Sequence, residues 1–100
     1  MRISEEQKQD IIASFHETFE KNDHLWLFGS RADDTKKGGD IDLYIETNEK
    51  SYAKVLDQKL NFLTKLTRKL GERKIDVVIK QPHKNLPIYE EARNTGILLA

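Results

Sequence analysis

Three aspartates have types and spacing that indicate metal-dependent chemistry. Asp40 and Asp42 flank a single isoleucine, and Asp76 follows much later in the chain. In an extended strand, residues i and i+2 project to the same face about 6.6 Å apart. Two carboxylates at this spacing can share metal ions that lie roughly 3.5–4 Å apart. If the strand that carries Asp76 is the neighbouring one, its backbone lies about 4.8 Å away and a three-carboxylate cluster results.

Such a cluster favours Mg²⁺, which prefers oxygen ligands and shares them with substrate phosphates. A two-metal site orients an attacking hydroxyl and stabilises a leaving pyrophosphate. Upstream, Gly29 allows backbone N–H groups to approach phosphate oxygens, Ser30 adds a hydroxyl, and Arg31 adds a charge-assisted contact. The predicted catalytic and metal-binding residues are therefore Asp40, Asp42 and Asp76, and the predicted nucleotide-binding residues are Gly29, Ser30 and Arg31.

Helices and short strands alternate in the segments expected to position these residues. Ser4 with Gln7 fits a capping box, which opens a helix expected to reach Lys21. A second helix is expected over 51–70, ending at Gly71, and a third over 87–95. The strands are expected at 25–28, 40–46 and 74–80, and the apolar stripe of the second helix comprises Tyr52, Val55, Leu56, Leu60, Leu63, Leu66 and Leu70.

The resulting order, α-β-(loop or short α)-β-α-β-α, predicts an α/β (α+β) fold in one domain spanning 1–100. We expect a small mixed sheet of about three strands, with the helices packed on one face. The polar segment 31–39 is expected to be a loop, in which Asp33, Asp34, Lys36 and Lys37 have no assigned role. The apolar tail 97–100 packs on the core or forms a partner surface, and the sequence leaves both alternatives open.

Composition narrows the class of protein. Lys plus Arg and Asp plus Glu both number 17, so the net charge is zero, which argues against broad nucleic-acid binding and leaves a homo-oligomer possible. The absence of cysteine excludes disulfides and thiol catalysis. Because no apolar run approaches the roughly 20 residues of a membrane span, and the N-terminus lacks a signal-peptide core, we expect a soluble cytoplasmic protein.

A family resemblance rests on three segments: Phe28-Gly29-Ser30-Arg31-Ala32, Gly39-Asp40-Ile41-Asp42-Leu43 and Lys74-Ile75-Asp76-Val77-Val78. They resemble the signature of the DNA polymerase β-like nucleotidyltransferase superfamily, above all its shortest branch, the minimal nucleotidyltransferase (MNT) domains. The resemblance covers nearly the whole chain. One departure is that nine residues separate Ser30 from Asp40, whereas many members have ten.

The resemblance implies roles for these residues. It implies that Gly29 and Ser30 hold a nucleoside triphosphate, that Asp40 and Asp42 bind Mg²⁺, and that Asp76 helps to activate the acceptor hydroxyl. MNT domains typically occur as antitoxins paired with a HEPN-domain toxin. The resemblance thus implies transfer of AMP from ATP to a hydroxyl of such a partner. Larger family members carry an acceptor-binding domain that this sequence lacks, so another polypeptide is expected to supply the acceptor.

Other interpretations remain open. A catalytically silent antitoxin would neutralise its partner by binding alone, and a different nucleotidyltransferase would act on a small-molecule hydroxyl. Asp40 and Asp42 are also compatible with ordinary exposed strand positions, although aspartate is depleted in strands. A Ca²⁺-binding loop is disfavoured because the sequence lacks the required series of ligands that ends in a glutamate.

Overall fold

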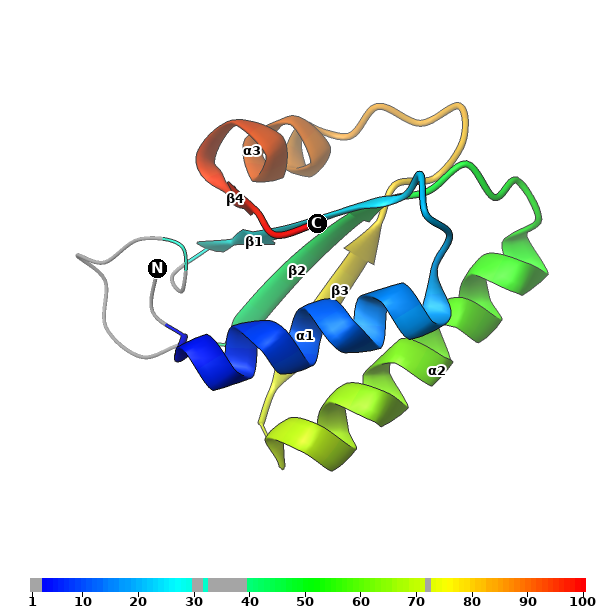
Figure 1. Ribbon diagram of the computed structural model, residues 1–100. Coiled ribbons are helices and arrows are strands. Elements are labelled where there is room, and N and C mark those ends of the chain that lie inside the picture. The colour runs from blue at the N-terminus through cyan, green and yellow to red at the C-terminus, as the bar shows by residue number, and fades with distance from the viewer. Residues whose placement is uncertain (1–2, 30–31, 33–39, 72) are drawn as a thin grey trace.

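A computed structural model of the chain describes residues 3–29, 32, 40–71 and 73–100 (Figure 1). Within these residues, the predicted helices and strands occur in the predicted order. The elements are α1 (Glu5–Thr18), β1 (His24–Phe28), β2 (Ile41–Glu46), α2 (Tyr52–Leu70), β3 (Ile75–Ile79), α3 (Pro87–Thr95) and β4 (Ile97–Leu98). None of the described helices is both long and apolar enough to cross a membrane.

The ends of α1 follow from local hydrogen bonds. The predicted capping box is present, with the Ser4 hydroxyl accepting from the Gln7 N–H and the Gln7 side chain accepting in return. The helix ends at Thr18, earlier than the predicted Lys21. A buried carboxylate explains the difference, because Asp23 accepts from the backbone N–H of Glu20 at 2.9 Å and from that of Asn48 at 3.2 Å.

Helix α2 has the predicted ends, but only the second half of its predicted apolar stripe reaches the core. Ser51 caps its N-terminus, and Gly71 ends it with a positive φ of 79°. The core-facing side chains of α2 include Phe62, which lies outside the predicted stripe, and Leu66. Three members of the predicted stripe are instead exposed, at 74%, 42% and 54% for Tyr52, Leu56 and Leu60. The stripe was therefore wrong over the first half of the helix, which extends past the core.

The described strands form a mixed sheet in the order β3-β2-β1-β4. β1 pairs antiparallel with β2 and with β4, whereas β2 and β3 are parallel. β4 is a fourth strand that the sequence did not predict. Through β4 and the adjoining residues, the tail 97–100 pairs with β1, with hydrogen bonds that join Leu25 to Leu99 and Ala100. Of the two alternatives that the sequence left open, the structure thus supports packing of the tail on the core.

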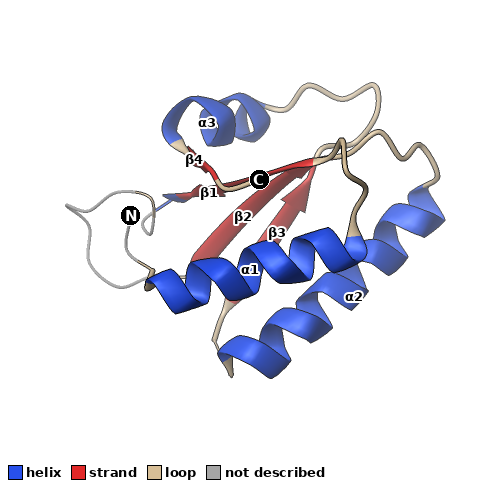
Figure 2. Ribbon diagram, in the orientation of Figure 1, coloured by secondary structure: helices blue, strands red, loops and turns tan. Residues whose placement is uncertain are grey.

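Helices cover both faces of the sheet, whereas the sequence predicted one covered face. In Figure 1, α1 and α2 lie on one side of the sheet and α3 lies on the other (Figure 2). On the α1/α2 side, the core contains alternate residues of β2 with apolar side chains of both helices. On the opposite side, fully buried Tyr44 of β2 packs with Phe28, Tyr89 and Ala92.

The direction of the connections explains this correction. The pairings make β2, β3 and β4 mutually parallel, so α2 and α3 both belong to parallel crossovers. The first crossover moves outward to β3, and the second returns across the sheet to β4. Because parallel crossovers are almost always right-handed, two that run in opposite directions place their helices on opposite faces.

Asp23 provides a test of this fold. Replacing it by alanine leaves two N–H groups without their acceptor, so we expect Asp23→Ala to lower the free energy of unfolding by about 2–4 kcal/mol. Urea denaturation measures the change. The exposed Asp57→Ala on α2 is the matched control and should change stability by less than about 0.5 kcal/mol. Equal effects of the two substitutions would contradict the role of Asp23.

Candidate active site

Gly29 follows β1 directly and approaches β2 more closely than any other residue type permits. Its φ is +74°, and a Cβ added there would collide with the carboxylate of Asp42. Phe28, the last residue of β1, is the register partner of Asp42. The Gly29 carbonyl accepts from the N–H of Ala32 at 3.2 Å. Glycine is therefore required here because of both its backbone angle and the carboxylate beside it.

The register of β2 and β3 brings the second and third aspartates together. Asp42 and Asp76 are partners in the parallel ladder, so β3 is the neighbour of β2, which is the condition that the sequence analysis set for their carboxylates to meet. Burial of Asp42 raises the pKa of its carboxyl, and the charges of Asp76 and Asp40 raise it further, while Lys74 opposes the shift. A hydrogen bond with Asp76 also contributes to the raised pKa of Asp42. These carboxylates therefore interact as one electrostatic unit.

Asp40 is near this pair but has another contact. It precedes β2, and its carboxylate forms an ion pair with the Lys74 ammonium at 3.4 Å. Among the residues that the structure describes, no three acidic or histidine side chains converge as a preformed metal site. The structure thus brings two of the three predicted ligands together and leaves the third paired with a lysine.

The carboxylate oxygens at this site fit a divalent metal ion that prefers oxygen ligands. Asp42 and Asp76 offer adjacent carboxylate oxygens. The pKa of Asp42 is raised first by burial and then by the charges of Asp76 and Asp40, and a bound cation would offset the part due to those charges. Mg²⁺ is usually held by one or two carboxylates together with substrate phosphates, so a complete protein cage is unnecessary. Asp40 would join this set by leaving Lys74, an exchange that both exposed side chains permit.

A pocket of about 670 Å³ opens at the pair. Gly29, Asp42 and Asp76 all line it. Its remaining lining residues are Phe28, Lys59, Leu63, Ile75, Val77, Val78, Ile88 and Glu91. The sequence analysis missed Lys59 of α2 and Glu91 of α3, because each looks like an ordinary charge on the wet face of a helix. Only the tertiary fold places them beside the aspartates.

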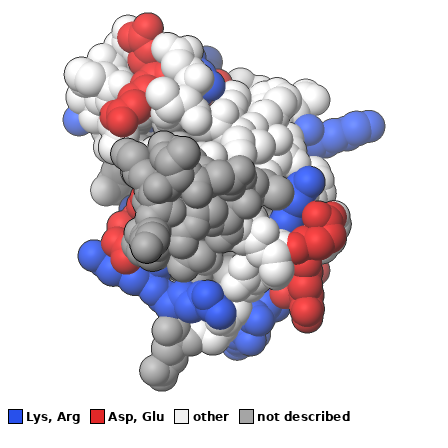
Figure 3. Space-filling view, turned by 90° about the vertical axis from the view of Figure 1, so that its left-hand side faces the viewer, with Lys and Arg blue, Asp and Glu red and all other residues white. Residues whose placement is uncertain are grey.

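Several predicted residues fall outside the described part of the chain. Ser30 and Arg31, the other predicted nucleotide-binding residues, belong to this group, as do Asp33, Asp34, Lys36 and Lys37. Around the grey residues in Figure 3, basic and acidic side chains both reach the surface. This face of the molecule therefore carries charges of both signs, in keeping with the net charge of zero.

Comparison with known families agrees with this geometry. The family model described as polymerase beta, nucleotidyltransferase matches residues 9–100. The match includes Gly29 and all three aspartates. No curated protein matches the sequence of the chain.

The raised pKa of Asp42 predicts the direction of its effect on stability. Because the folded state binds this proton more tightly than the unfolded state, ionisation of Asp42 lowers stability as the pH rises above its ordinary pKa of 3.8. Without divalent metal, Asp42→Asn should therefore raise the melting temperature by a few degrees at pH 7. The gain should shrink as the pH falls toward the ordinary pKa.

Thermal unfolding of both proteins from pH 3 to pH 8 measures this difference. Asp57→Asn, at an exposed position of α2, is the control, and its melting temperature should equal that of the wild type at every pH. A variant at Asp42 that melts below the wild type at pH 7 would show that the carboxylate stabilises the metal-free fold, contrary to the account.

Proposed function

The chain belongs to the polymerase β nucleotidyltransferase family, and we propose that it transfers AMP from Mg²⁺-bound ATP to a hydroxyl group of a partner protein. Nucleotidyl transfer is the activity that the family supports. The single observation that carries the assignment to these residues is the pairing of Asp42 with Asp76 beside Gly29, at an open pocket.

In this reaction the acceptor hydroxyl oxygen bonds to the α-phosphorus of the nucleotide, and the bond from that phosphorus to the β-phosphate bridging oxygen breaks. Pyrophosphate leaves, and the hydroxyl proton passes to a carboxylate. Bound Mg²⁺ would neutralise the charge on the phosphates and on the leaving group. Nucleotide and metal would be held by Asp42, by Asp40 once released from Lys74, and by the backbone at Gly29.

Exposure supports a division of labour between the paired aspartates. Both aspartates line the pocket, but Asp42 is half-buried and lies against Gly29, whereas Asp76 is exposed. We therefore assign metal and nucleotide binding to Asp42 and acceptance of the acceptor proton to Asp76. General-base assistance of this kind contributes about 10²–10⁴-fold to a rate.

The acceptor in this proposal is a hydroxyl, such as that of tyrosine, on a HEPN-domain toxin that the modification neutralises. The support is the resemblance of the Gly29 and Asp40–Asp42 segments to MNT antitoxins, together with an openly accessible site. Neutralisation by binding alone is the second candidate function. It is favoured by the ion pair between Asp40 and Lys74, which occupies a carboxylate that catalysis requires.

Nucleotide binding is the first testable consequence. We expect ATP to raise the melting temperature only when Mg²⁺ is present. GTP, CTP and UTP, measured in the same way, should not raise it. At one hundred times the dissociation constant, the gain is about 2.7 kcal/mol, which is several degrees for a small domain. Equal melting temperatures with and without every nucleotide would contradict catalysis by the isolated chain.

The division of labour predicts different losses in two variants. Asp42→Asn should abolish both the stabilisation by Mg²⁺-ATP and the transfer of AMP. Asp76→Asn should keep most of that stabilisation and lose transfer by about 10²-fold or more. The measurement is transfer of label from α-labelled ATP to a HEPN-domain protein of the same organism, with Asp57→Asn as the matched control.

The same variants separate the two candidate functions. Under the catalytic proposal, neither Asp42→Asn nor Asp76→Asn protects cells against the toxin. Protection that survives both substitutions at wild-type strength would refute modification as the mechanism and establish neutralisation by contact.

A further inference from the structure

The outer edge of β3 is open for pairing among the described strands. β3 stands at one end of the sheet, next to β2 alone. The carbonyl of Lys74 and the N–H of Lys80, at the two ends of β3, both bond to β2. Because alternate residues of a strand bond to the same neighbour, the intervening backbone groups point away from the sheet. The outward-facing groups belong to Ile75, Val77 and Ile79.

A groove follows this edge along its whole length. At the start of β3 it is the active-site pocket, which is lined by residues on both faces of the strand, including Val77 and Val78. At the end of β3 it continues as a second hollow of about 370 Å³. Lys59 lines both hollows, so they are neighbours along the edge. We call the two hollows together the β3-edge groove.

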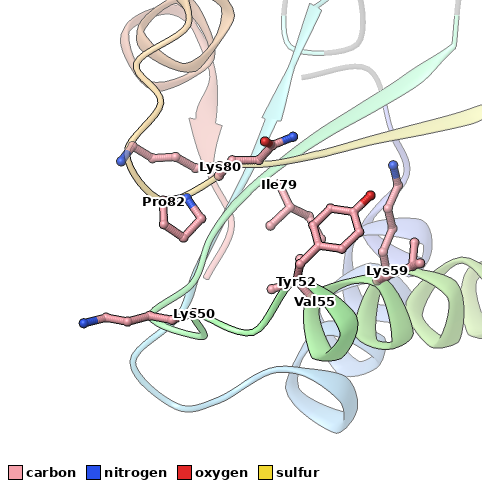
Figure 4. Close-up of a pocket in the computed structure, with 9 residues that line it drawn as sticks. Lys50, Tyr52, Val55, Lys59, Ile79, Lys80 and Pro82 are labelled. Carbon is pink, nitrogen blue, oxygen red and sulfur yellow. The ribbon is translucent and has the colours of Figure 1, made fainter.

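Apolar side chains of α2 form one wall of the β3-edge groove. Tyr52 and Leu56 line the second hollow, and Leu60 continues the row one turn further along the helix. Their four-residue spacing places them on one helical face, and they are the exposed members of the predicted core stripe. Figure 4 shows Tyr52 and Lys59 rising from α2 toward the strand that carries Ile79. A row of exposed apolar residues next to an open strand is typical of a binding surface.

Charge changes sign along the β3-edge groove. The second hollow is lined by Lys50, Lys59 and Lys80, and no acidic residue lines it. None of these lysines forms an ion pair with another residue of the described ranges. The active-site end instead carries carboxylates, among them Asp76. A ligand that spans the groove therefore needs negative charge at the end near Lys80.

We propose that the β3-edge groove binds an extended segment of the acceptor protein, which pairs with β3 as an added strand and presents its hydroxyl side chain to Asp76. Addition of a strand to an exposed edge is a general mode of peptide binding, in which the backbone gives affinity and alternate side chains give specificity. This inference rests on the proposed function, since it names how the acceptor reaches the site.

The groove also sets the chemistry of that segment. Lys80 lies four positions after Asp76, which is about 13 Å along a strand. The segment therefore carries an acidic residue about four positions from its hydroxyl residue, with apolar side chains between them for Tyr52 and Leu56. A second copy of the chain fits poorly, because edge-to-edge pairing of two β3 strands brings the flanking lysines of both copies together.

A library of random nonapeptides displayed on phage and selected on the wild-type chain, without nucleotide or Mg²⁺, tests the β3-edge groove directly. We expect enriched peptides with an acidic residue and a hydroxyl residue about four positions apart. The double variant Lys50→Glu/Lys80→Glu should weaken their binding about tenfold or more. Leu56→Ser should weaken it severalfold.

Matched controls exist for both kinds of change. Lys54→Glu alters an exposed lysine of α2 that lines a different hollow, and Leu98→Ser alters an exposed leucine on β4 at the opposite edge of the sheet. Neither should change binding. Methylation of alternate backbone nitrogens of a selected peptide should abolish binding in one register and spare it in the other, as strand pairing requires.

Three results would contradict the proposal that the β3-edge groove binds an acceptor segment. They are no enrichment of peptides, equal peptide binding by the double lysine variant, or a dimer of the chain that the same lysine variant disrupts. The outcome is separable from that of the proposed function. Peptides that bind as expected but accept no AMP would leave the groove standing and count against transfer. If the chain transfers AMP to a protein, and the lysine and Leu56 variants transfer it equally well, the activity would stand and the groove would have no part in acceptor binding.

Discussion

The parallel pairing of β2 with β3 holds Asp42 and Asp76 side by side, although their like charges oppose it. The pairing is maintained by the burial of the residues between and around them. Ile41, Leu43 and Val77 belong to the core beneath α1 and α2, and burial of each such side chain contributes roughly 1.5–3 kcal/mol. Apolar packing thus stabilises a carboxylate pair that would otherwise separate, and it places the pair where a bound cation can relieve the repulsion.

The two crossovers decide what surrounds that pair. Because α2 and α3 cover opposite faces, each contributes side chains to the pocket from its own side of β3, with Lys59 on one and Glu91 on the other. On the α3 side, Tyr44 stacks on Tyr89 at 5.7 Å, and the Tyr89 hydroxyl accepts from the N–H of Gln81 just after β3. α3 is therefore held against both β2 and the end of β3. Among the strands that the structure describes, none pairs with the outer edge of β3.

Much of this arrangement could be predicted from local sequence. Ser4 and Ser51 mark helix starts through hydrogen bonds that involve only neighbouring residues, and Pro87 marks another through its fixed φ. The spacing of Asp40 and Asp42 predicts a common face only where both residues are in a strand, and β2 begins at Ile41, just after Asp40. Features that depend on the tertiary fold could not be predicted in this way. The pattern of β2 does not reveal that Tyr44 is buried on the second face, and β4 is too short to have a period.

The apolar stripe of α2 shows why such patterns are incomplete. Helical periodicity reports which residues share a face, but it does not report where the core ends. Leu66 reaches the core, whereas Tyr52 lies beyond it and remains exposed. Similarly, the sequence indicates that Asp76 lies on a strand, but the helix between β2 and β3 leaves their register undetermined. The partnership of Asp76 with Asp42 comes only from the folded chain.

The central claim is that Asp42 and Asp76 belong to one site, in which Asp42 binds metal and nucleotide directly beside the carboxylate of Asp76. Carbon-13 NMR of the aspartate side-chain carboxyls, during titration with Mg²⁺ and a non-hydrolysable ATP analogue, tests it most directly. The account predicts that the resonances of Asp42 and Asp76 shift together with one midpoint, while that of exposed Asp57 does not move. Shifts with separate midpoints, or two carboxyl resonances that ignore the ligand, would contradict it.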